Sequence, residues 1–311
     1  MGSPTLAGMH QPTAPVRHAE SADTPPVGVS RRPALSPSRA ADFRQCPLLY
    51  RFRAIDKIPE QPSRAAVRGT LVHAVLEQLY DLPPAQRVPA AAHALVMPVW
   101  EQLGAADAQL RDALFPPADG ADAELAAWLA SAGPFLDRYF ELEDPRHLEP
   151  AARELLVEAE LESGTLLRGF VDRLDVDSRG ATSVVDYKTG AVPRPERESR
   201  VLFQLKFYAL VLLRERGTVP GELRLLYLST GEYLTYHPDA DELMRFGRLL
   251  DALWAAITEA GATGDFRPSP GPACDWCDHK ARCPAWGGTP PPYPGWPAGQ
   301  VAPEPVAPAG A

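Results

Sequence analysis

Residues 166–188 have the sequence LLRGFVDRLDVDSRGATSVVDYK, and this stretch decides the fold class of the chain. It contains two apolar runs rich in β-branched residues, and the turn residues Asp177-Ser178-Arg179-Gly180 between them predict a β-hairpin. A similar run, LLVEAELE (155–162), leads into residue 166 through a turn at Ser163-Gly164. We therefore expect three consecutive antiparallel strands.

Helical patterns surround these strands. The clearest helix places Leu71, Val75 and Leu79 on one apolar stripe, and Ser36-Pro37-Ser38 has the hydroxyl cap and first-turn proline with which a helix begins. The expected strands are 155–162, 166–176, 182–188 and 222–229, and the expected longer helices are 65–80, 88–115, 121–143, 199–215 and 239–260. The sequence thus predicts an α/β fold with a helical insertion after the first long helix.

Composition favours a globular centre with two low-complexity ends. The chain has 311 residues, of which 45% are hydrophobic and 23% charged, and these values exclude disorder of the whole chain. Its 35 prolines are densest near the two ends. We expect a disordered Pro-rich arm at 1–35, one folded domain at 36–286 and a disordered Pro-rich tail at 287–311.

The sequence also indicates the cellular compartment of the protein. No apolar run approaches the roughly 18 residues of a membrane span, and the first residues lack the apolar region of a signal peptide. A cytoplasmic protein without membrane association is therefore expected. In such a reducing compartment, four cysteines are expected to be metal ligands or buried apolar residues rather than disulfides.

Charge is distributed unevenly along the chain. The net charge of −9 argues against a nucleic-acid partner, because phosphate binding needs Lys and Arg. However, residues 36–75 carry a local balance of +4, whereas residues 101–162 carry −11. The basic segment keeps a nucleic-acid partner open, because local fields decide partners.

The run 182–188 also carries a chemical pattern. Side chains alternate along a strand, so Asp186 and Lys188 share one face. If Asp172 on the neighbouring strand lies beside Asp186, the two carboxylates repel each other unless a hard cation such as Mg²⁺ lies between them. A nearby lysine could then hold or deprotonate a water, as metal-assisted hydrolysis of a phosphodiester requires. The alternative is an exposed strand with a surface Asp–Lys pair.

Four motifs together resemble one family. GFVDRLD (169–175) and VDYKTG (185–190) resemble the core of the PD-(D/E)XK nucleases, specifically the RecB-like exonuclease branch. GTLVH (69–73) resembles the helix that supplies a metal-binding histidine, and QLKFY (204–208) resembles the Q-x-x-x-Y motif of the following helix. The resemblance implies a mixed central sheet flanked by helices.

The resemblance also implies roles for single residues. The ligands of Mg²⁺ or Mn²⁺ would be His73, Asp172, Asp186 and the backbone carbonyl of Tyr187. Lys188 would position or activate the attacking water, and Gln204 and Tyr208 would shape the site and contact the DNA strand. The roles of two other acids are left open: Glu158 could join the site, and Glu77 could contact the metal or lie on a solvated helix face.

The cysteines follow the pattern Cys274-x2-Cys277-x5-Cys283, with Cys46 far upstream. Four thiolates suit zinc or a [4Fe–4S] cluster, whereas a disulfide is not expected in the cytosol. RecB-like nucleases of the AddB and CRISPR-associated types carry one cysteine before the nuclease core and three after it. The resemblance therefore implies a [4Fe–4S] cluster that joins the two ends of the domain.

The segment around Cys46 is rich in arginine and aromatic residues. One interpretation is a groove for a DNA strand, with phosphate contacts and base stacking; the other is that the aromatic rings pack beneath the cysteines. The residues concerned are Phe43, Arg44, Tyr50, Arg51, Phe52 and Arg53.

The sequence therefore predicts a metal-dependent DNA nuclease, an exonuclease acting on single-stranded or unwound ends in repair or recombination. No G-x-x-x-x-G-K-[ST] phosphate loop occurs, so the chain would have no ATP site, and a separate helicase would open duplex ends. The alternatives are a CRISPR-adaptation nuclease, a non-catalytic iron–sulfur DNA-binding subunit, and a zinc-stabilised interaction protein whose Pro-rich tails bind partner domains.

Overall fold

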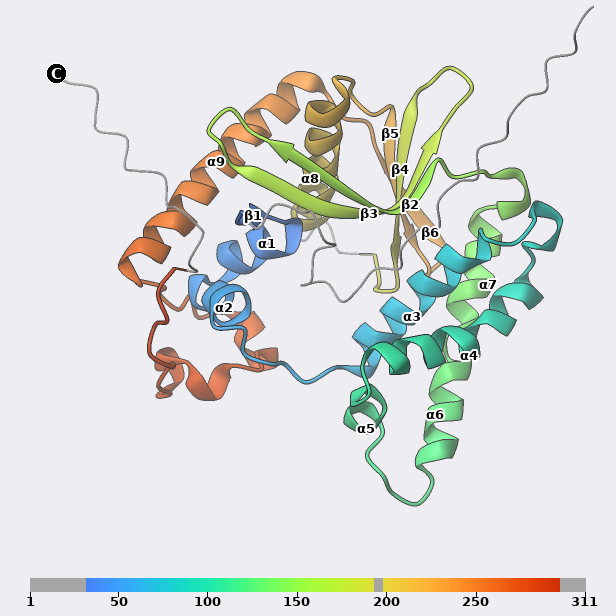
Figure 1. Cartoon of the computed structure of the whole chain (residues 1–311), viewed down its shortest axis with the longest axis horizontal. Helices are drawn as coiled ribbons and strands as arrows, with labels where there is room; N and C mark the ends of the chain where they lie inside the picture. The colour runs from blue at the N-terminus through green and yellow to red at the C-terminus, as the bar shows by residue number, and fades with distance from the viewer. Residues whose placement is uncertain (1–31, 193–197, 297–311) are drawn as a thin grey trace, which may run out of the picture. The chain divides into compact units, whose positions relative to one another are not determined.

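The computed structural model describes residues 32–192 and 198–296, which form one six-stranded mixed sheet flanked by helices (Figure 1). Contacts along the chain separate Met1–Ser30 from Arg31–Ala311, and the first of these units lies outside the described residues. The strands are β1 (Ala34–Leu35), β2 (Ala152–Glu160), β3 (Leu166–Val176), β4 (Thr182–Lys188), β5 (Glu222–Tyr227) and β6 (Glu232–Tyr236).

Strand β3 is the centre of the sheet. It pairs with β2 along most of its length, with β1 near its start and with β4 near its end. The β1 pairing ends at Leu167 and the β4 pairing begins at Arg173. Because β2 occupies the other edge, β1 and β4 share one edge of β3, and this edge is unpaired just before Arg173. The predicted antiparallel order of β2, β3 and β4 is confirmed.

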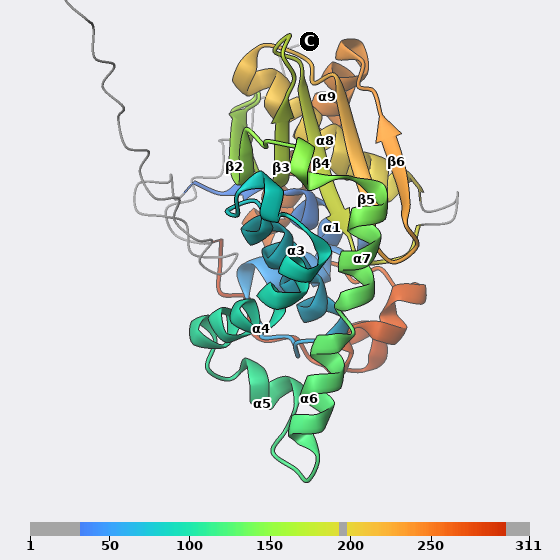
Figure 2. The same ribbon diagram turned by 90° about the vertical axis from the view of Figure 1, so that its right-hand side faces the viewer.

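Helices cover both faces of the sheet, each over its own apolar core (Figures 1 and 2). One core is formed with α1 (Pro37–Gln45), α2 (Pro47–Tyr50), α8 (Glu198–Arg216) and α9 (Ala240–Thr263). The other is formed with α3 (Arg64–Leu79), α4 (Pro89–Ala106), α5 (Leu110–Leu114), α6 (Ala121–Ala130) and α7 (Gly133–Leu142). The expected α/β fold with its helical insertion, α4–α7, is therefore confirmed.

Capping residues explain where the long helices begin. The Ser63 hydroxyl accepts a hydrogen bond from Ala66 N, 3.1 Å away, at the start of α3. The Asp239 carboxylate accepts one from Glu242 N, 2.9 Å away, at the start of α9. Gly264 ends α9 with a φ of 73°, a left-handed conformation that glycine adopts without strain. Along the described chain, no helix has the length and apolar character needed to cross a membrane.

Both boundaries of the predicted folded domain are wrong, and the predicted helices 88–115 and 121–143 are each two helices, α4 with α5 and α6 with α7. Ala34 and Leu35, assigned to the disordered arm, are buried in β1 beside β3. Residues 287–296, assigned to the disordered tail, lie along α9: the Tyr293 hydroxyl donates a 2.6 Å hydrogen bond to Gly261 O, and Trp296 packs edge-on against Trp254. The remainder of both predicted disordered segments, 1–31 and 297–311, lies outside the described residues.

Candidate active site

Two aspartates meet where β3 and β4 separate. Arg173 pairs with Val185, so Asp172 lies one step beyond this pair, opposite Asp186. The Asp172 carboxylate takes the place of a backbone acceptor, because its Oδ2 receives the N–H of Tyr187 at 2.8 Å. The predicted juxtaposition of Asp172 and Asp186 is therefore present, and the unpaired edge of β3 gives the carboxylate room.

Lys188 and two residues of α8 surround Asp186. Lys188 Nζ lies 2.6 Å from Asp186 Oδ2 and donates a 2.9 Å hydrogen bond to Gln204 Oε1. Gln204 Nε2 in turn donates to Asp186 Oδ1 at 3.0 Å and to the Tyr208 hydroxyl at 3.3 Å. The residues predicted from the Q-x-x-x-Y pattern thus hold the carboxylate and the ammonium group in fixed positions.

Two glycines of the motifs are required by close packing at this site. A Cβ atom on Gly169 would lie 2.8 Å from Cε1 of Tyr208, and one on Gly69 would lie 3.0 Å from Oγ1 of Thr189. Gly169 therefore lets the Tyr208 ring approach β3, while Gly69 brings α3 against the end of β4. These contacts connect the four sequence motifs physically.

His73 reaches the aspartates from α3. Its Nδ1 lies 3.3 Å from Asp172 Oδ2, and its ring meets the edge of Tyr187. Burial by itself lowers the pKa of His73, but the charge of Asp172 and the hydrogen bond to it outweigh burial and raise the pKa to about 9. The surrounding carboxylates thus favour the charged imidazole, and a bound cation would compete with that proton.

The two aspartates differ electrostatically. Burial raises the pKa of Asp186 to about 6; Lys188 opposes this rise and the charge of Asp172 adds to it. Burial also raises the pKa of Asp172, but the charge of His73, its hydrogen bond and the Tyr187 N–H hold that pKa below its usual range. Imidazole nitrogen and carboxylate oxygens together are a donor set that binds divalent cations, so the residues present fit the implied metal.

Sequence reasoning missed one acid. His73, Asp172 and Glu154 each offer a ligand atom, and these atoms all lie within 4.8 Å of one another. Burial, followed by the charges of Asp172 and Glu77, raises the pKa of Glu154 to about 7. Glu154 also has a φ of 43°, a conformation that costs a non-glycine residue about 1–2 kcal/mol. No motif marked this residue.

Glu158, which the sequence left open, lies outside the site. It lies opposite Arg168 on β3, and Arg168 Nε donates a 2.5 Å hydrogen bond to its carboxylate. It is four residues further along β2 than Glu154, and its pairing with Arg168 settles that open alternative. The coordination role of the Tyr187 carbonyl stays a prediction.

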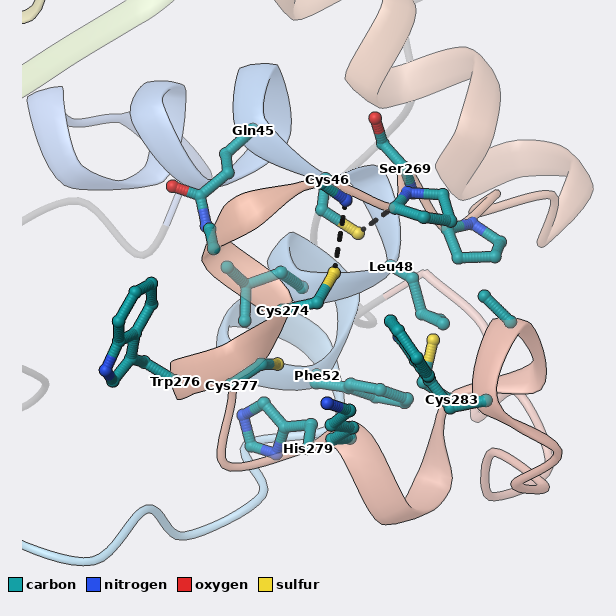
Figure 3. A pocket seen from close by; sticks show the side chains of 18 of the residues that line it. Gln45, Cys46, Leu48, Phe52, Ser269, Cys274, Trp276, Cys277, His279 and Cys283 are labelled. Carbon is teal, nitrogen blue, oxygen red and sulfur yellow. Dashed lines mark hydrogen bonds between the residues drawn. The ribbon is translucent and has the colours of Figure 1, made fainter. Parts of the chain in front are cut away.

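The four cysteines line one cavity of about 550 Å³, in which their thiols face a common space (Figure 3). Cys46 lies between α1 and α2, and the other three lie on the short helical turns η5 (Pro272–Trp276), η6 (Lys280–Arg282) and η7 (Pro284–Trp286) or beside them. Backbone N–H groups of Ser269 and Gly271 donate to the Sγ atoms of Cys46 and Cys274, each at 3.4 Å. Residues distant in sequence therefore converge on one site.

The aromatic rings of the segment around Cys46 favour the packing interpretation, and a DNA groove there stays a prediction. Tyr50 and Phe52 are buried in the core, so their rings pack as the alternative interpretation proposed. Arg51 pairs with Asp56 at 3.0 Å, and Arg53 pairs with Asp42 and Glu60 at 2.6 and 2.8 Å. These two arginines are thus paired with nearby carboxylates, whereas Arg44 is exposed and lies over the Phe203 ring, 4.6 Å from its centroid.

A family model described as the PD-(D/E)XK nuclease superfamily matches residues 34–284. The chain belongs to this superfamily. The Gene 69 protein of Mycobacterium phage D29 is 24% identical over 295 residues, covering 82% of this chain and 97% of the phage protein. The crystal structure of an exonuclease candidate from Eubacterium rectale is similar over 79% of this chain and 87% of its own, with a TM-score of 0.49 and 13% identity.

Behind the site of this PD-(D/E)XK protein lies a buried ionic network centred on Arg173. The Arg173 side chain faces away from Asp172 and is 0% exposed. It donates hydrogen bonds to both carboxylate oxygens of Glu143 at 2.7 and 3.0 Å, and to Asp175 Oδ2 at 3.0 Å. It also donates to the hydroxyls of Tyr80 and Tyr187 at 3.0 and 3.1 Å. The network thus connects α3 and the region following α7 to the two strands that carry the aspartates.

Proposed function

We propose that this chain is a RecB-like, metal-dependent deoxyribonuclease, an exonuclease that hydrolyses single-stranded or unwound DNA in repair or recombination. The observation that carries the proposal is the convergence of His73, Asp172, Asp186 and Lys188 at one end of the β3–β4 pair. Membership of the nuclease superfamily supports the reaction class. A complete set of cation-binding side chains with a fixed lysine also argues against a non-catalytic subunit.

Each residue of the site would have a distinct role in the reaction. His73, Asp172 and Asp186 would hold Mg²⁺ or Mn²⁺. When bound, such a cation polarises the phosphate and stabilises the charge that develops in the transition state. Lys188 would donate a hydrogen bond that orients the attacking water and stabilises the negative charge developing on it, and Gln204 keeps the Lys188 ammonium beside Asp186. Tyr208, fixed by Gln204 and by the absence of a side chain at Gly169, would support the path of the DNA strand.

Digestion of end-labelled linear DNA tests this proposal. With Mg²⁺ or Mn²⁺ we expect the wild-type protein to release label from single-stranded DNA, and Asp186→Asn to lower the rate by about 10²-fold or more. The chelator EDTA should stop the reaction. Glu158→Gln, an acid on the same sheet outside the site, is the matched control and should cleave as wild type does. The assignment would be contradicted if both variants lost cleavage, or if both cleaved as the wild-type protein does.

Circular single-stranded DNA distinguishes an exonuclease from an endonuclease. An enzyme that needs an end leaves the circle intact while it degrades the linear form of the same sequence. Cleavage of both forms at similar rates would overturn the exonuclease part of the proposal and leave the nuclease part standing. The separate helicase and the cytoplasmic location stay predictions.

We also propose that Cys46, Cys274, Cys277 and Cys283 hold a [4Fe–4S] cluster. Four soft thiolate donors suit iron–sulfur or zinc. N–H groups directed at sulfur are a common feature of cluster environments, and such groups reach Cys46 and Cys274. The cluster would join the start and the end of the nuclease domain, as the sequence pattern implies.

Metal analysis of anaerobically purified protein decides between iron and zinc. We expect about four iron atoms and four sulfides per chain in the wild-type protein, and loss of most iron in Cys277→Ser. Trp276→Phe, which changes a neighbouring cavity residue without removing a thiol, should keep its full iron content. Protease should cleave both ends of the Cys277→Ser domain faster, because ligand binding contributes folding energy. One zinc per chain without sulfide would refute the cluster.

A further inference from the structure

Three acidic side chains lie in a row across β2, β3 and β4. Arg153 pairs with Arg173 and Leu155 with Val171, so Glu154 lies directly opposite Asp172. On the other side of Asp172, the register places Asp186. Residues directly opposite one another share a face of the sheet, so Glu154, Asp172 and Asp186 all face the site. The motifs account for only two of these three acids.

Such a row is unfavourable without a cation. Like charges directly opposite each other on neighbouring strands destabilise a sheet. Asp186 has Lys188 and Gln204 as partners, and Asp172 has His73 and the Tyr187 N–H. Within residues 32–192 and 198–296, by contrast, no hydrogen bond or ion pair reaches the Glu154 carboxylate. The neighbouring Arg153 instead binds Asp81 and the carbonyl of Glu77.

The geometry also places Glu154 beside the imidazole. The ligand atoms of His73, Glu154 and Asp172 lie within 4.8 Å of one another, a separation that one shared cation can bridge. The backbone of Glu154 is not extended, because its φ is 43°. A glutamate thus occupies a position whose backbone favours glycine or asparagine.

We propose that Glu154 is a further ligand of the divalent cation, on the His73 side of Asp172. The proposal rests on the proposed function, because it adds a residue to the same cation site. Three carboxylates and one imidazole would then surround the cation, and Asp172 would lie at the centre of the donor set. The left-handed backbone at Glu154 would direct the third carboxylate to the cation, and a bound cation would relieve the repulsion among the acids.

Mn²⁺ binding without DNA tests this role. Titration of the metal-free protein, followed by calorimetry or by the electron paramagnetic resonance of free Mn²⁺, gives a dissociation constant independent of cleavage. We expect Glu154→Gln to weaken Mn²⁺ binding about 10- to 100-fold, the loss seen when the environment of a metal is altered. Glu158→Gln is the matched control, since it removes an acid from the same strand outside the site, and it should bind as the wild-type protein does.

Thermal unfolding separates a ligand from a residue that only supports the fold. In EDTA, Glu154→Gln should unfold at the same temperature as the wild-type protein or higher, because one repelling charge is gone. On addition of Mn²⁺ the wild-type midpoint should rise more than that of the variant. Glu154→Gly, which also relieves the left-handed backbone, should behave in the same way. A lower midpoint of both variants in EDTA would show a structural role and overturn the proposal.

Asp186→Asn distinguishes failure of this inference from failure of the proposed function. If Asp186→Asn weakens Mn²⁺ binding but Glu154→Gln binds within about twofold of the wild-type protein, Glu154 is not a ligand and the nuclease site stands. If the folded wild-type protein binds no Mn²⁺ at all, the cation site itself is refuted, and the inference falls with it.

Discussion

Replacing Lys188 with methionine is expected to lower the rate of DNA cleavage by about 10²- to 10⁴-fold, the range attributed to a single acid–base group. Lys188 Nζ is held 2.6 Å from Asp186 and 2.9 Å from Gln204, yet its side chain is 28% exposed and open to a water or a phosphate. Methionine keeps the unbranched apolar part of the side chain but removes the ammonium group. Mn²⁺ binding should persist or tighten, because Asp186 loses its competing cation.

The measurement is single-turnover cleavage of end-labelled linear DNA at saturating Mn²⁺. Lys206→Met is the matched control, because Lys206 lies on α8 but pairs with Glu242 outside the site. It should cleave at the wild-type rate. A Lys188→Met protein with more than about a tenth of wild-type activity would remove Lys188 from the mechanism, since an acid–base group contributes more than that.

Arg173→Met is expected to produce the largest loss of stability, about 3–5 kcal/mol of the free energy of unfolding. The change would leave the carboxylates of Glu143 and Asp175 without their shared guanidinium, and Glu143 is almost fully buried. Arg224 still reaches Glu143, at 3.2 Å, but cannot replace the bidentate contact. For a domain of this size, the loss corresponds to a fall of roughly 6–20 °C in the unfolding temperature.

Urea titration in the presence of EDTA measures this effect apart from cation binding. Arg179→Met is the control, because Arg179 is exposed and pairs with Asp177 in a surface turn; its urea midpoint should not change. The double variant Arg173→Met/Glu143→Leu should recover part of the lost stability, since it removes the unpaired buried charge as well. A loss below about 1 kcal/mol in Arg173→Met would show that the network is dispensable, because it is well under the cost of breaking a buried pair.

The main features of the fold follow from local patterns. Alternation and turn residues predicted the β3–β4 hairpin, and its register brings Asp172 opposite Asp186. The same reasoning placed Gln204 and Tyr208 on one face of a helix, where they are hydrogen bonded. These features depend on residues close in sequence, or on motifs whose residues contact one another in the fold.

Glu154 could not be found in this way, because its place depends on the length of one loop. The sequence predicted a two-residue turn at Ser163-Gly164. Instead, Leu161 N donates a hydrogen bond to Thr165 O, so the loop between the strands is 162–164 and has one residue more than predicted. Within it, Gly164 adopts a φ of 86°. A shift of one position in register changes which residue faces Asp172, and only the three-dimensional loop reveals it.

Contacts between residues distant in sequence could not be predicted from local patterns either. Two residues, Ala34 and Leu35, are too few to show a strand period, yet they are buried in the sheet. The aromatic run around Cys46 was open to interpretation as a nucleic-acid surface, because the burial of Tyr50 and Phe52 is visible only in space.

The packing of the early segment against the late one has a consequence for biosynthesis. Tyr50 stacks on Phe266, and Phe52 lies against His279, roughly 220 positions later in the chain. At about 5–20 residues per second, a ribosome needs roughly 10–45 s to make the intervening residues. During that time Tyr50 and Phe52 lack these late partners and are available to chaperones. The nascent chain can therefore complete its core only when the cysteine-bearing segment emerges.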